Sequence, residues 1–427
     1  MRGVITTRRI HGLTVIVMSV LLASCATFDR HRHDVNAICD RDRFPAERAS
    51  PACRSAVVEH TNGVDVAYVE FTDQGLLYDR RQLARALALL REKEDQDLQV
   101  VVFVHGWKHS AESDDLDVGK FRARVLPAFV RQRPSVRTVG VYVGWRGKSL
   151  RPTGFVQNLS FYDRKATADH VARGSVRELF SHLRALGHPR TPGAGREVSV
   201  TLIGHSFGGL ILYNAFAESL LDSLIAANNG NRSSPRLARP VVDAVILLNP
   251  AFEATRFEPL FQAAQEFLES KSEPPWRYGQ GQRPVFVSIT SETDSATKTW
   301  FRFGRAVNSI FEHEGWTDQD HDRTDYAKRL EKLANTHTIG HMERYRTHRL
   351  ALVRPPDQAA GSNRGAEPIA CSGVANRLLA GETRFPLWNM YADANVIDGH
   401  HDIYGENLWE LVARLSDRRI DVDHICP

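Results

Sequence analysis

Short apolar runs alternate with longer stretches of helical spacing along most of the chain. The apolar runs predict strands at 64–71, 98–104, 138–143, 198–203, 241–248, 285–290 and 387–397. The helical spacing predicts helices at 81–92, 120–131, 164–186, 210–227 and around 408–415. Strands that are apolar along their whole length are typical of parallel sheets covered on both faces. The pattern therefore predicts an α/β fold with a mostly parallel central sheet and helices on both faces.

One strand leads directly into a serine. The run 198–203 is followed by Gly204-His205-Ser206-Phe207-Gly208-Gly209, and a helical stretch comes next. The G-x-S-x-G spacing also arises by chance, so the strand before it and the helix after it carry the argument. Glycine on both sides lets neighbouring backbone approach a tight turn closely. The pattern predicts that Ser206 is a nucleophile on a strand-to-helix turn.

A second motif ends the run 98–104 with His105-Gly106-Trp107, where a loop can direct a backbone N–H at an oxyanion. Together the two motifs resemble the serine esterase and lipase branch of the α/β-hydrolase superfamily, over roughly residues 64–415. The resemblance implies that the N–H groups of Phe207 and Trp107 form the oxyanion hole. It also implies that His105 shapes its loop and is not the catalytic base.

Such a serine needs an imidazole to accept its proton and a carboxylate to orient that imidazole. The strand 285–290 ends in Ser291-Glu292-Thr293-Asp294, which offers Glu292 or Asp294 as the acid. Similarity to the S-x-x-D-x-A-T turn of related bacterial hydrolases favours Asp294. Glu253, after the preceding strand, is an alternative because some relatives carry the acid there.

The base is expected just before the last helix, where His400 and His401 stand next to each other. Consecutive loop residues point in different directions, so one of the two is expected to reach Ser206. Similarity to a G-H-x-D-I pattern that begins at Gly399 favours His400, and His401 is the alternative base.

The N-terminus has the pattern of an export signal. Three arginines precede a short apolar stretch at 13–23, which is too short to span a bilayer permanently. The end of the stretch, Leu22-Ala23-Ser24-Cys25, resembles a bacterial lipoprotein signal. This implies removal of residues 1–24, lipidation of Cys25 and a membrane anchor on the periplasmic side of a bacterial envelope. Ala26 favours the outer membrane, and a plain secreted protein is the alternative.

Charge and cysteines narrow the functional classes. The chain has 55 basic and 51 acidic residues, and without the three arginines of residues 1–24 its net charge is +1. A nearly neutral chain lacks the basic surface of a nucleic-acid-binding protein. The four remaining cysteines allow three pairings, of which proximity favours Cys39–Cys53 and Cys371–Cys426. No C-x-x-C or H-E-x-x-H motif occurs, so we expect no metal and no cofactor.

The predicted organisation is a signal peptide at 1–24, a polar tether at 25–62 and a hydrolase domain at 63–427. Two insertions are expected, at about 253–283 and 297–385. The first has apolar residues at helical spacing, which favours a helix packed on the sheet over a lid or acyl-chain wall. The second is too polar to form another large core and is expected to border the active site.

These features predict an envelope-anchored serine hydrolase, a carboxylesterase or lipase-like enzyme that cleaves carboxylic esters through an acyl-serine intermediate. One alternative is a non-catalytic lipoprotein that uses the same fold as a binding or scaffolding module. Another is an acyltransferase that passes the acyl group to an alcohol or amine. The size of the acyl group depends on the shape of the pocket, which spacing does not define.

Overall fold

The computed structural model describes residues 30–43, 50–92, 95–147, 155–187, 196–228, 237–238, 240–269, 278–279, 281–297, 324–353, 369–373 and 384–425. The predicted signal peptide and Cys25 lie outside these residues. Residues 32–427 form one compact unit.

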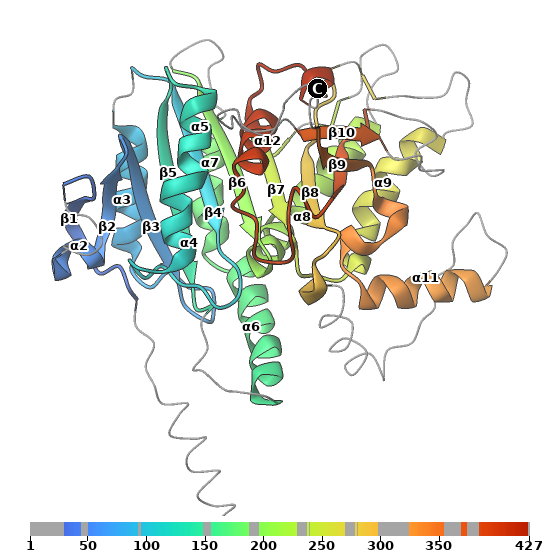
Figure 1. Cartoon of the computed structure of the whole chain (residues 1–427), viewed down its shortest axis with the longest axis horizontal. Helices are drawn as coiled ribbons and strands as arrows, with labels where there is room; N and C mark the ends of the chain where they lie inside the picture. Colours follow the sequence, from blue (N-terminus) through green and yellow to red (C-terminus); the bar gives the residue numbers. More distant parts are fainter. Residues whose placement is uncertain are drawn as a thin grey trace, which may run out of the picture. The chain divides into compact units, whose positions relative to one another are not determined.

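The described strands form one eleven-stranded sheet in the order β1-β2-β3-β5-β4-β6-β7-β8-β11-β9-β10 (Figure 1). Neighbours are parallel from β3 to β9, whereas β2 is antiparallel to β3 and β10 is antiparallel to β9. The mostly parallel sheet predicted from sequence is therefore confirmed. The strands are β1 (Asp34–Asp40), β2 (Ala56–Thr61), β3 (Val64–Phe71), β4 (Leu98–Val104), β5 (Arg137–Trp145), β6 (Val198–His205), β7 (Ala244–Leu248), β8 (Phe286–Ser291), β9 (His348–Leu352), β10 (Ile369–Gly373) and β11 (Leu387–Ala392).

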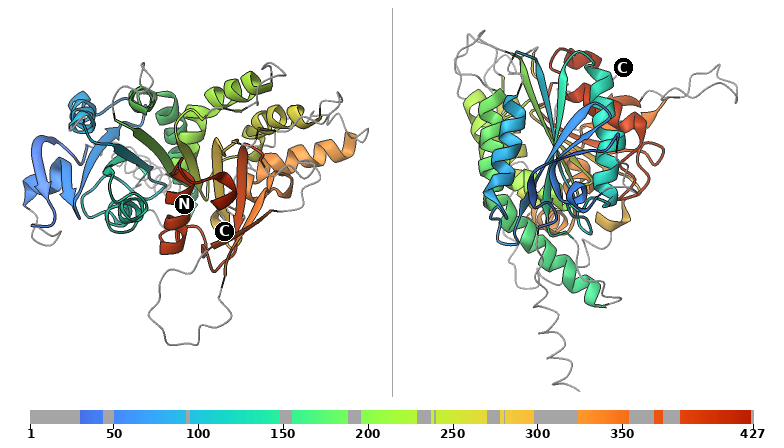
Figure 2. Two further views of the ribbon diagram at one scale, coloured as in Figure 1. Left: turned by 90° about the horizontal axis from the view of Figure 1, so that it is seen from above. Right: turned by 90° about the vertical axis from the view of Figure 1, so that its left-hand side faces the viewer.

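Helices cover both faces of the sheet (Figure 2). One face carries α3 (Arg80–Arg91), α7 (Val176–Gly187), α8 (Phe207–Asn228) and α9 (Glu258–Glu269), and the other carries η2 (Phe121–Val125), α5 (Leu126–Gln132) and α12 (Glu406–Ser416). Successive residues of a strand point to opposite faces. On β4, Val100 and Val102 accordingly join the first core, and Val101 and Phe103 the second. Both faces are buried, which explains why β4 is apolar from Val100 to Val104. The remaining described helices are α2 (Pro51–Ser55), α4 (Leu116–Lys120), α6 (Phe155–Arg173), η3 (Ala254–Arg256), α11 (Thr324–Thr336), η6 (Ile339–His341), η7 (Glu343–Tyr345) and η9 (Val422–His424).

Part of the predicted tether is not a tether. Within 25–62 the chain forms β1, α2 and β2, and both strands belong to the sheet. Two arginines of this segment are buried in ion pairs, since Glu59 on β2 contacts Arg32 at 2.7 Å and Arg41 at 2.6 Å, whereas Arg43 and Arg54 are exposed. Charged side chains are stable in a protein interior when they are paired, and composition alone did not show the partners.

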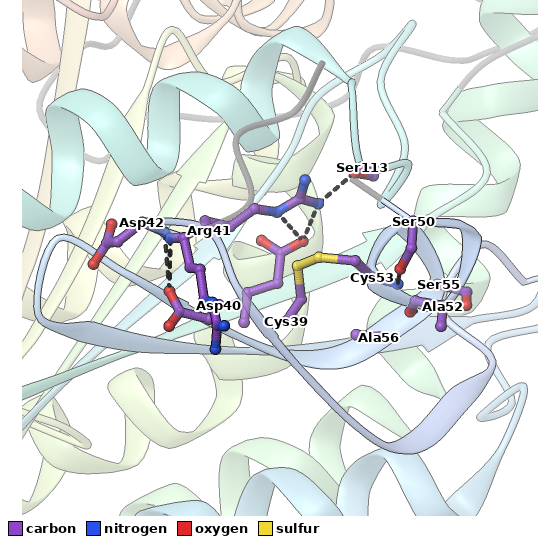
Figure 3. Close-up of a disulfide and its surroundings, with 12 residues drawn as sticks. Cys39, Asp40, Arg41, Asp42, Ser50, Ala52, Cys53, Ser55, Ala56 and Ser113 are labelled. Carbon is purple, nitrogen blue, oxygen red and sulfur yellow. Dashed lines mark hydrogen bonds and ion pairs between the residues drawn. A yellow bond between two sulfur atoms is a disulfide. The ribbon is translucent and has the colours of Figure 1, made fainter. Parts of the chain in front are cut away.

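A disulfide joins Cys39 on β1 to Cys53 on α2, as predicted (Figure 3). Arg41 follows Cys39 by two residues, and its guanidinium donates hydrogen bonds to Ser113 and to Glu59. Cys371 lies on β10. Its predicted partner, Cys426, lies outside the described residues.

The helix predicted at 164–186 is two helices, α6 and α7, that meet at Gly174. A Cβ atom on Gly174 would lie 2.2 Å from the carbonyl oxygen of Gly75, which itself has φ +78°. The N–H of Ser175 donates to the same oxygen at 2.7 Å. A backbone contact from a distant loop thus interrupts the helix, and the apolar periodicity on either side does not reveal it.

Both predicted insertions contribute to the described fold. In 253–283, the side chains of Phe257, Leu260 and Phe261 are buried in the same core as α8, in agreement with a packed helix. In 297–385, β9 and β10 extend the sheet beyond β11. This second segment is therefore in part an edge of the sheet, built by backbone hydrogen bonds that its polar composition does not exclude.

One helix among the described residues, Phe207–Ala227 within α8, is long and apolar enough to cross a membrane by length and composition. It packs against β6, β7 and α9. Its apolar composition is explained by this central place in the core.

Candidate active site

Ser206 occupies the turn between β6 and α8 with φ +54°, a left-handed conformation that is rare for residues other than glycine. The flanking glycines explain how the turn fits. A Cβ atom on Gly204 would lie 2.5 Å from the Gly208 carbonyl oxygen, and one on Gly208 would lie 2.0 Å from that of Val104. The G-x-S-x-G spacing is therefore a packing requirement in this structure.

Three side chains from distant parts of the sequence form one hydrogen-bonded chain. The hydroxyl of Ser206 lies 2.8 Å from Nε2 of His400, and Nδ1 of His400 lies 2.9 Å from Oδ2 of Asp294. Ser206 follows β6, Asp294 lies in the turn after β8, and His400 lies in the loop between β11 and α12. Nδ1 must donate to the carboxylate, which leaves Nε2 of the neutral ring free to accept the serine proton.

Asp294 is fully buried and remains ionised. Burial opposes its charge, but hydrogen bonds from His400 and Thr297 lower its pKa to about 2. The N–H of Thr297 donates to Oδ1 at 3.0 Å, and its hydroxyl donates to Oδ2 at 2.6 Å. The carboxylate is thus fixed in orientation as well as in charge.

The alternative residues are placed elsewhere. His401 is exposed, and its ring centroid is 4.9 Å from that of His400. Glu253 forms a buried ion pair with Lys165 and a second with Arg256 at 3.0 Å. Glu292 accepts a hydrogen bond from the N–H of Ala394 at 3.1 Å. The structure therefore brings His400 and Asp294 to Ser206.

The loop after β4 is held by His105. Its Nε2 accepts from the N–H of Trp145 at 3.1 Å, and its Nδ1 donates to the carbonyl oxygen of Gly106 at 2.9 Å. The imidazole ring of His105 also stacks on the indole ring of Trp145, with the ring centroids 5.4 Å apart. Both ring nitrogens are engaged with backbone, so His105 shapes the loop that carries Trp107, in agreement with the resemblance.

The two residues whose amides are predicted to form the oxyanion hole both contact one aromatic ring through their side chains. Phe161 of α6 contacts Trp107 at a centroid distance of 5.7 Å and Phe207 at 4.9 Å. Phe207 is the first residue of α8, where backbone N–H groups have no acceptor within the helix and the helix dipole is positive. The oxyanion role of both amides stays a prediction.

Two further residues were not identified from the sequence. Nδ2 of Asn249 donates to the carbonyl oxygens of Gly399 at 3.1 Å and His400 at 3.0 Å. Nε2 of His205 donates to the carbonyl oxygen of His400 at 2.9 Å. The only sequence signals were an asparagine directly after β7 and the variable position of the serine motif, and neither indicates a partner.

Among the described residues, no group of three or more histidine, cysteine, aspartate or glutamate side chains is arranged to hold a metal ion. The groups that meet at Ser206, His400 and Asp294 are a hydroxyl, an imidazole and a carboxylate.

A family model of the α/β-hydrolase family matches residues 101–393, which is more than half of the chain. The chain belongs to this family and is an α/β hydrolase. The matched range includes Ser206 and Asp294 but ends before His400.

Solved structures with partial similarity include two hydrolases. Phospholipase PlaB from Legionella pneumophila is 16% identical, with a TM-score of 0.23 over 51% of this chain and 43% of that one. This chain therefore spans less than half the length of that phospholipase. Siderophore hydrolase EstB from Aspergillus nidulans is 15% identical, with a TM-score of 0.25 over 75% of this chain and 82% of that one. No curated protein matches the sequence.

Proposed function

We propose that this protein is a serine hydrolase that cleaves carboxylic esters through an acyl-Ser206 intermediate. The observation that supports the proposal most directly is the hydrogen-bonded chain from Asp294 through His400 to Ser206. Its geometry matches the requirement that a hydroxyl nucleophile be within hydrogen-bond reach of a base that a third group orients.

In the first half of the reaction, Oγ of Ser206 attacks the ester carbonyl carbon while Nε2 of His400 takes the hydroxyl proton. The carbonyl oxygen becomes an oxyanion, and the carboxylate of Asp294 stabilises the imidazolium. The tetrahedral intermediate then expels the alcohol, which takes the proton from Nε2. The product of this half is an acyl ester on Ser206.

In the second half, water attacks the acyl carbon and gives its proton to Nε2 of His400. Collapse of the second intermediate releases the carboxylic acid and returns the proton to Oγ of Ser206. Both intermediates carry an oxyanion, which we assign to the N–H groups of Phe207 and Trp107. Fixed donors of this kind act on charge that develops during the reaction.

A fluorophosphonate probe tests the nucleophile. We expect the folded protein to be labelled on Ser206, as read from the mass of the modified peptide, and Ser206→Ala to remain unlabelled. Ester turnover by Ser206→Ala or His400→Ala should fall by on the order of 10⁶-fold, because triad members act as a unit. The control is His401→Ala, which should turn over ester at close to the wild-type rate. A folded wild-type protein with neither labelling nor turnover would instead support the non-catalytic alternative.

We also propose that the protein is anchored in a bacterial envelope through lipidated Cys25. The support is the Leu22-Ala23-Ser24-Cys25 pattern, which lies outside the described residues. Labelled fatty acid should be incorporated into the wild-type protein and not into Cys25→Ala, which should also leave the membrane fraction. Equal membrane attachment of both proteins would contradict the anchor.

A further inference from the structure

The backbone carbonyl of His400 is held from two sides by buried side chains. Nε2 of His205 donates to its oxygen at 2.9 Å, and Nδ2 of Asn249 donates to the same oxygen at 3.0 Å. His205 is 2% exposed and Asn249 is fully buried. Neither side chain hydrogen-bonds to the Ser206 hydroxyl among the described residues, so both act on the catalytic groups indirectly, and both contact His400.

Asn249 connects the ends of two strands with the loop that carries His400. It follows β7 with φ +44°, a left-handed conformation that asparagine tolerates better than most residues. Its Oδ1 accepts from the N–H of Ser291 at 2.9 Å, at the end of β8 that leads to the acid. Its Nδ2 donates to Gly399 and His400 in the loop that carries the base. One side chain thus connects the acid turn with the base loop.

His205 connects the nucleophile to the same loop, because it directly precedes Ser206. A carbonyl oxygen can only accept, so Nε2 of His205 carries the proton. Burial lowers the pKa of His205 well below its usual range, which keeps the ring neutral. Nδ1 is buried and has no hydrogen-bond partner among the described residues. The neutral ring therefore donates from Nε2.

The loop that carries His400 lies outside the regular strands and helices. Other contacts hold the residues before it, since Ser291 Oγ donates to the carbonyl oxygen of Ile397 at 2.7 Å and the N–H of Gly399 donates to Thr293 Oγ1 at 2.8 Å. These contacts stop short of His400. Among the described residues, the two donors to its own carbonyl are the hydrogen bonds that hold the backbone of His400.

We propose that His205 and Asn249 are positioning residues that clamp the His400 backbone so that its ring stays within reach of both Ser206 and Asp294. The inference rests on the proposed serine hydrolase function. A displacement of about 1 Å at a catalytic group can cost on the order of 100-fold in rate. The clamp therefore affects turnover much more than substrate binding.

Matched variants separate the hydrogen bond from the volume of the side chain. His205→Met removes the donor at similar size, whereas His205→Gln restores an N–H at a similar distance from the backbone. Asn249→Asp keeps the acceptor for Ser291 and removes the donors, and Asn249→Gly keeps the left-handed backbone without any side chain. We expect kcat to fall about 10-fold to 100-fold in His205→Met, Asn249→Asp and Asn249→Gly, with KM nearly unchanged. His205→Gln should recover most of the loss.

A spectroscopic readout distinguishes positioning from general destabilisation. The proton between Nδ1 of His400 and Asp294 should give a low-field NMR resonance in the wild-type protein. The resonance should broaden or shift in His205→Met and Asn249→Gly and return in His205→Gln. The control is His348→Gln on β9, which alters a histidine that packs on Trp388 at 4.4 Å. It should lower the melting temperature and leave both kcat and the resonance as they are.

The possible results are distinct. If the wild-type protein neither reacts with fluorophosphonate nor hydrolyses esters, the proposed function fails and the clamp fails with it. If the wild-type protein is active and folded His205→Met and Asn249→Gly keep wild-type kcat, the clamp alone is wrong. It is also wrong if His205→Gln loses as much kcat as His205→Met. Should His205→Met not fold, the isosteric Asn249→Asp decides by the same kcat measurement.

Discussion

Replacing Asp294 by asparagine should change the protonation of His400 without changing the shape of the site. Oδ1 of Asp294 accepts the N–H of Thr297 at 3.0 Å, so the amide oxygen of asparagine should take that place. The amide nitrogen then faces Nδ1 of His400, where Oδ2 now lies at 2.9 Å. An amide N–H requires an acceptor there, which moves the ring proton to Nε2. The ring then cannot accept the proton of Ser206.

Two magnitudes follow from this geometry. The wrong tautomer of the base costs about 10⁴-fold in kcat in a comparable triad. Separately, the pKa of Asp294 is lowered from 3.8 to about 2 in the folded protein, against the opposing effect of burial. At about 1.4 kcal/mol per pKa unit, ionised Asp294 contributes about 2 kcal/mol to folding stability.

The sign of the pH dependence follows from the lowered pKa. Between pH 4 and pH 2 the unfolded chain binds more protons at this carboxyl than the folded one does. The contribution is therefore fully present above about pH 4 and is lost as the pH falls towards 2. Asparagine does not titrate, so the wild-type protein should lose about 2 kcal/mol more than Asp294→Asn over this interval.

Urea unfolding of both proteins at several pH values from 6 to 2 measures the stability difference, and ester turnover at neutral pH measures kcat. The matched control is Glu253→Gln, which removes the carboxylate paired with Lys165 and Arg256. It should reduce stability and retain turnover much better than Asp294→Asn. An Asp294→Asn enzyme within tenfold of wild-type kcat would contradict the assignment of the acid. A pH-independent stability difference would contradict its ionisation.

Three further changes test the packing of the fold. Gly208→Ala would place a Cβ atom 2.0 Å from the Val104 carbonyl oxygen. The free energy of unfolding in urea should therefore fall by about 3 kcal/mol or more, and a fall of less than about 1 kcal/mol would refute the close approach. The double variant Cys39→Ser/Cys53→Ser removes a disulfide that links residues 14 positions apart, and it should lower the free energy of unfolding by about 3 kcal/mol. Ester turnover should change little, because β1 lies at the edge of the sheet. Loss of turnover in the folded variant would contradict this prediction. Glu59→Gln leaves the buried Arg32 and Arg41 without their carboxylate partner and should lower the free energy of unfolding by about 3–5 kcal/mol, measured by heat or urea. An unchanged free energy of unfolding would mean that water solvates these arginines.

Local sequence was sufficient where one segment determines its own structure. The strand before Ser206 and the helix after it were predicted because apolar β-branched residues and helical periodicity act over a few positions. The Gly-x-Ser-x-Gly spacing reports a steric need at one turn, which the contacts of Gly204 and Gly208 explain. The candidate triad was reached by combining such segments with chain order and a family resemblance.

Sequence failed where a distant partner decides the outcome. The helix at 164–186 is divided because the carbonyl oxygen of Gly75 contacts Gly174. The charges of the polar segment before 62 can be buried because Glu59 pairs with Arg32 of the same segment and with Arg122 of η2. Neither partner is marked by spacing in the sequence.

The sequence by itself determined the parallel α/β architecture, the serine turn and the short set of residues from which a base and an acid could come. Only the tertiary structure decided among them, by placing His400 and not His401 at 2.8 Å from Ser206 and Asp294 behind it. Only the structure shows the donors of His205 and Asn249 to the same loop. The physical reason is range, since strand and turn preferences act between neighbours, whereas hydrogen bonds across the sheet depend on where every intervening strand and loop comes to lie.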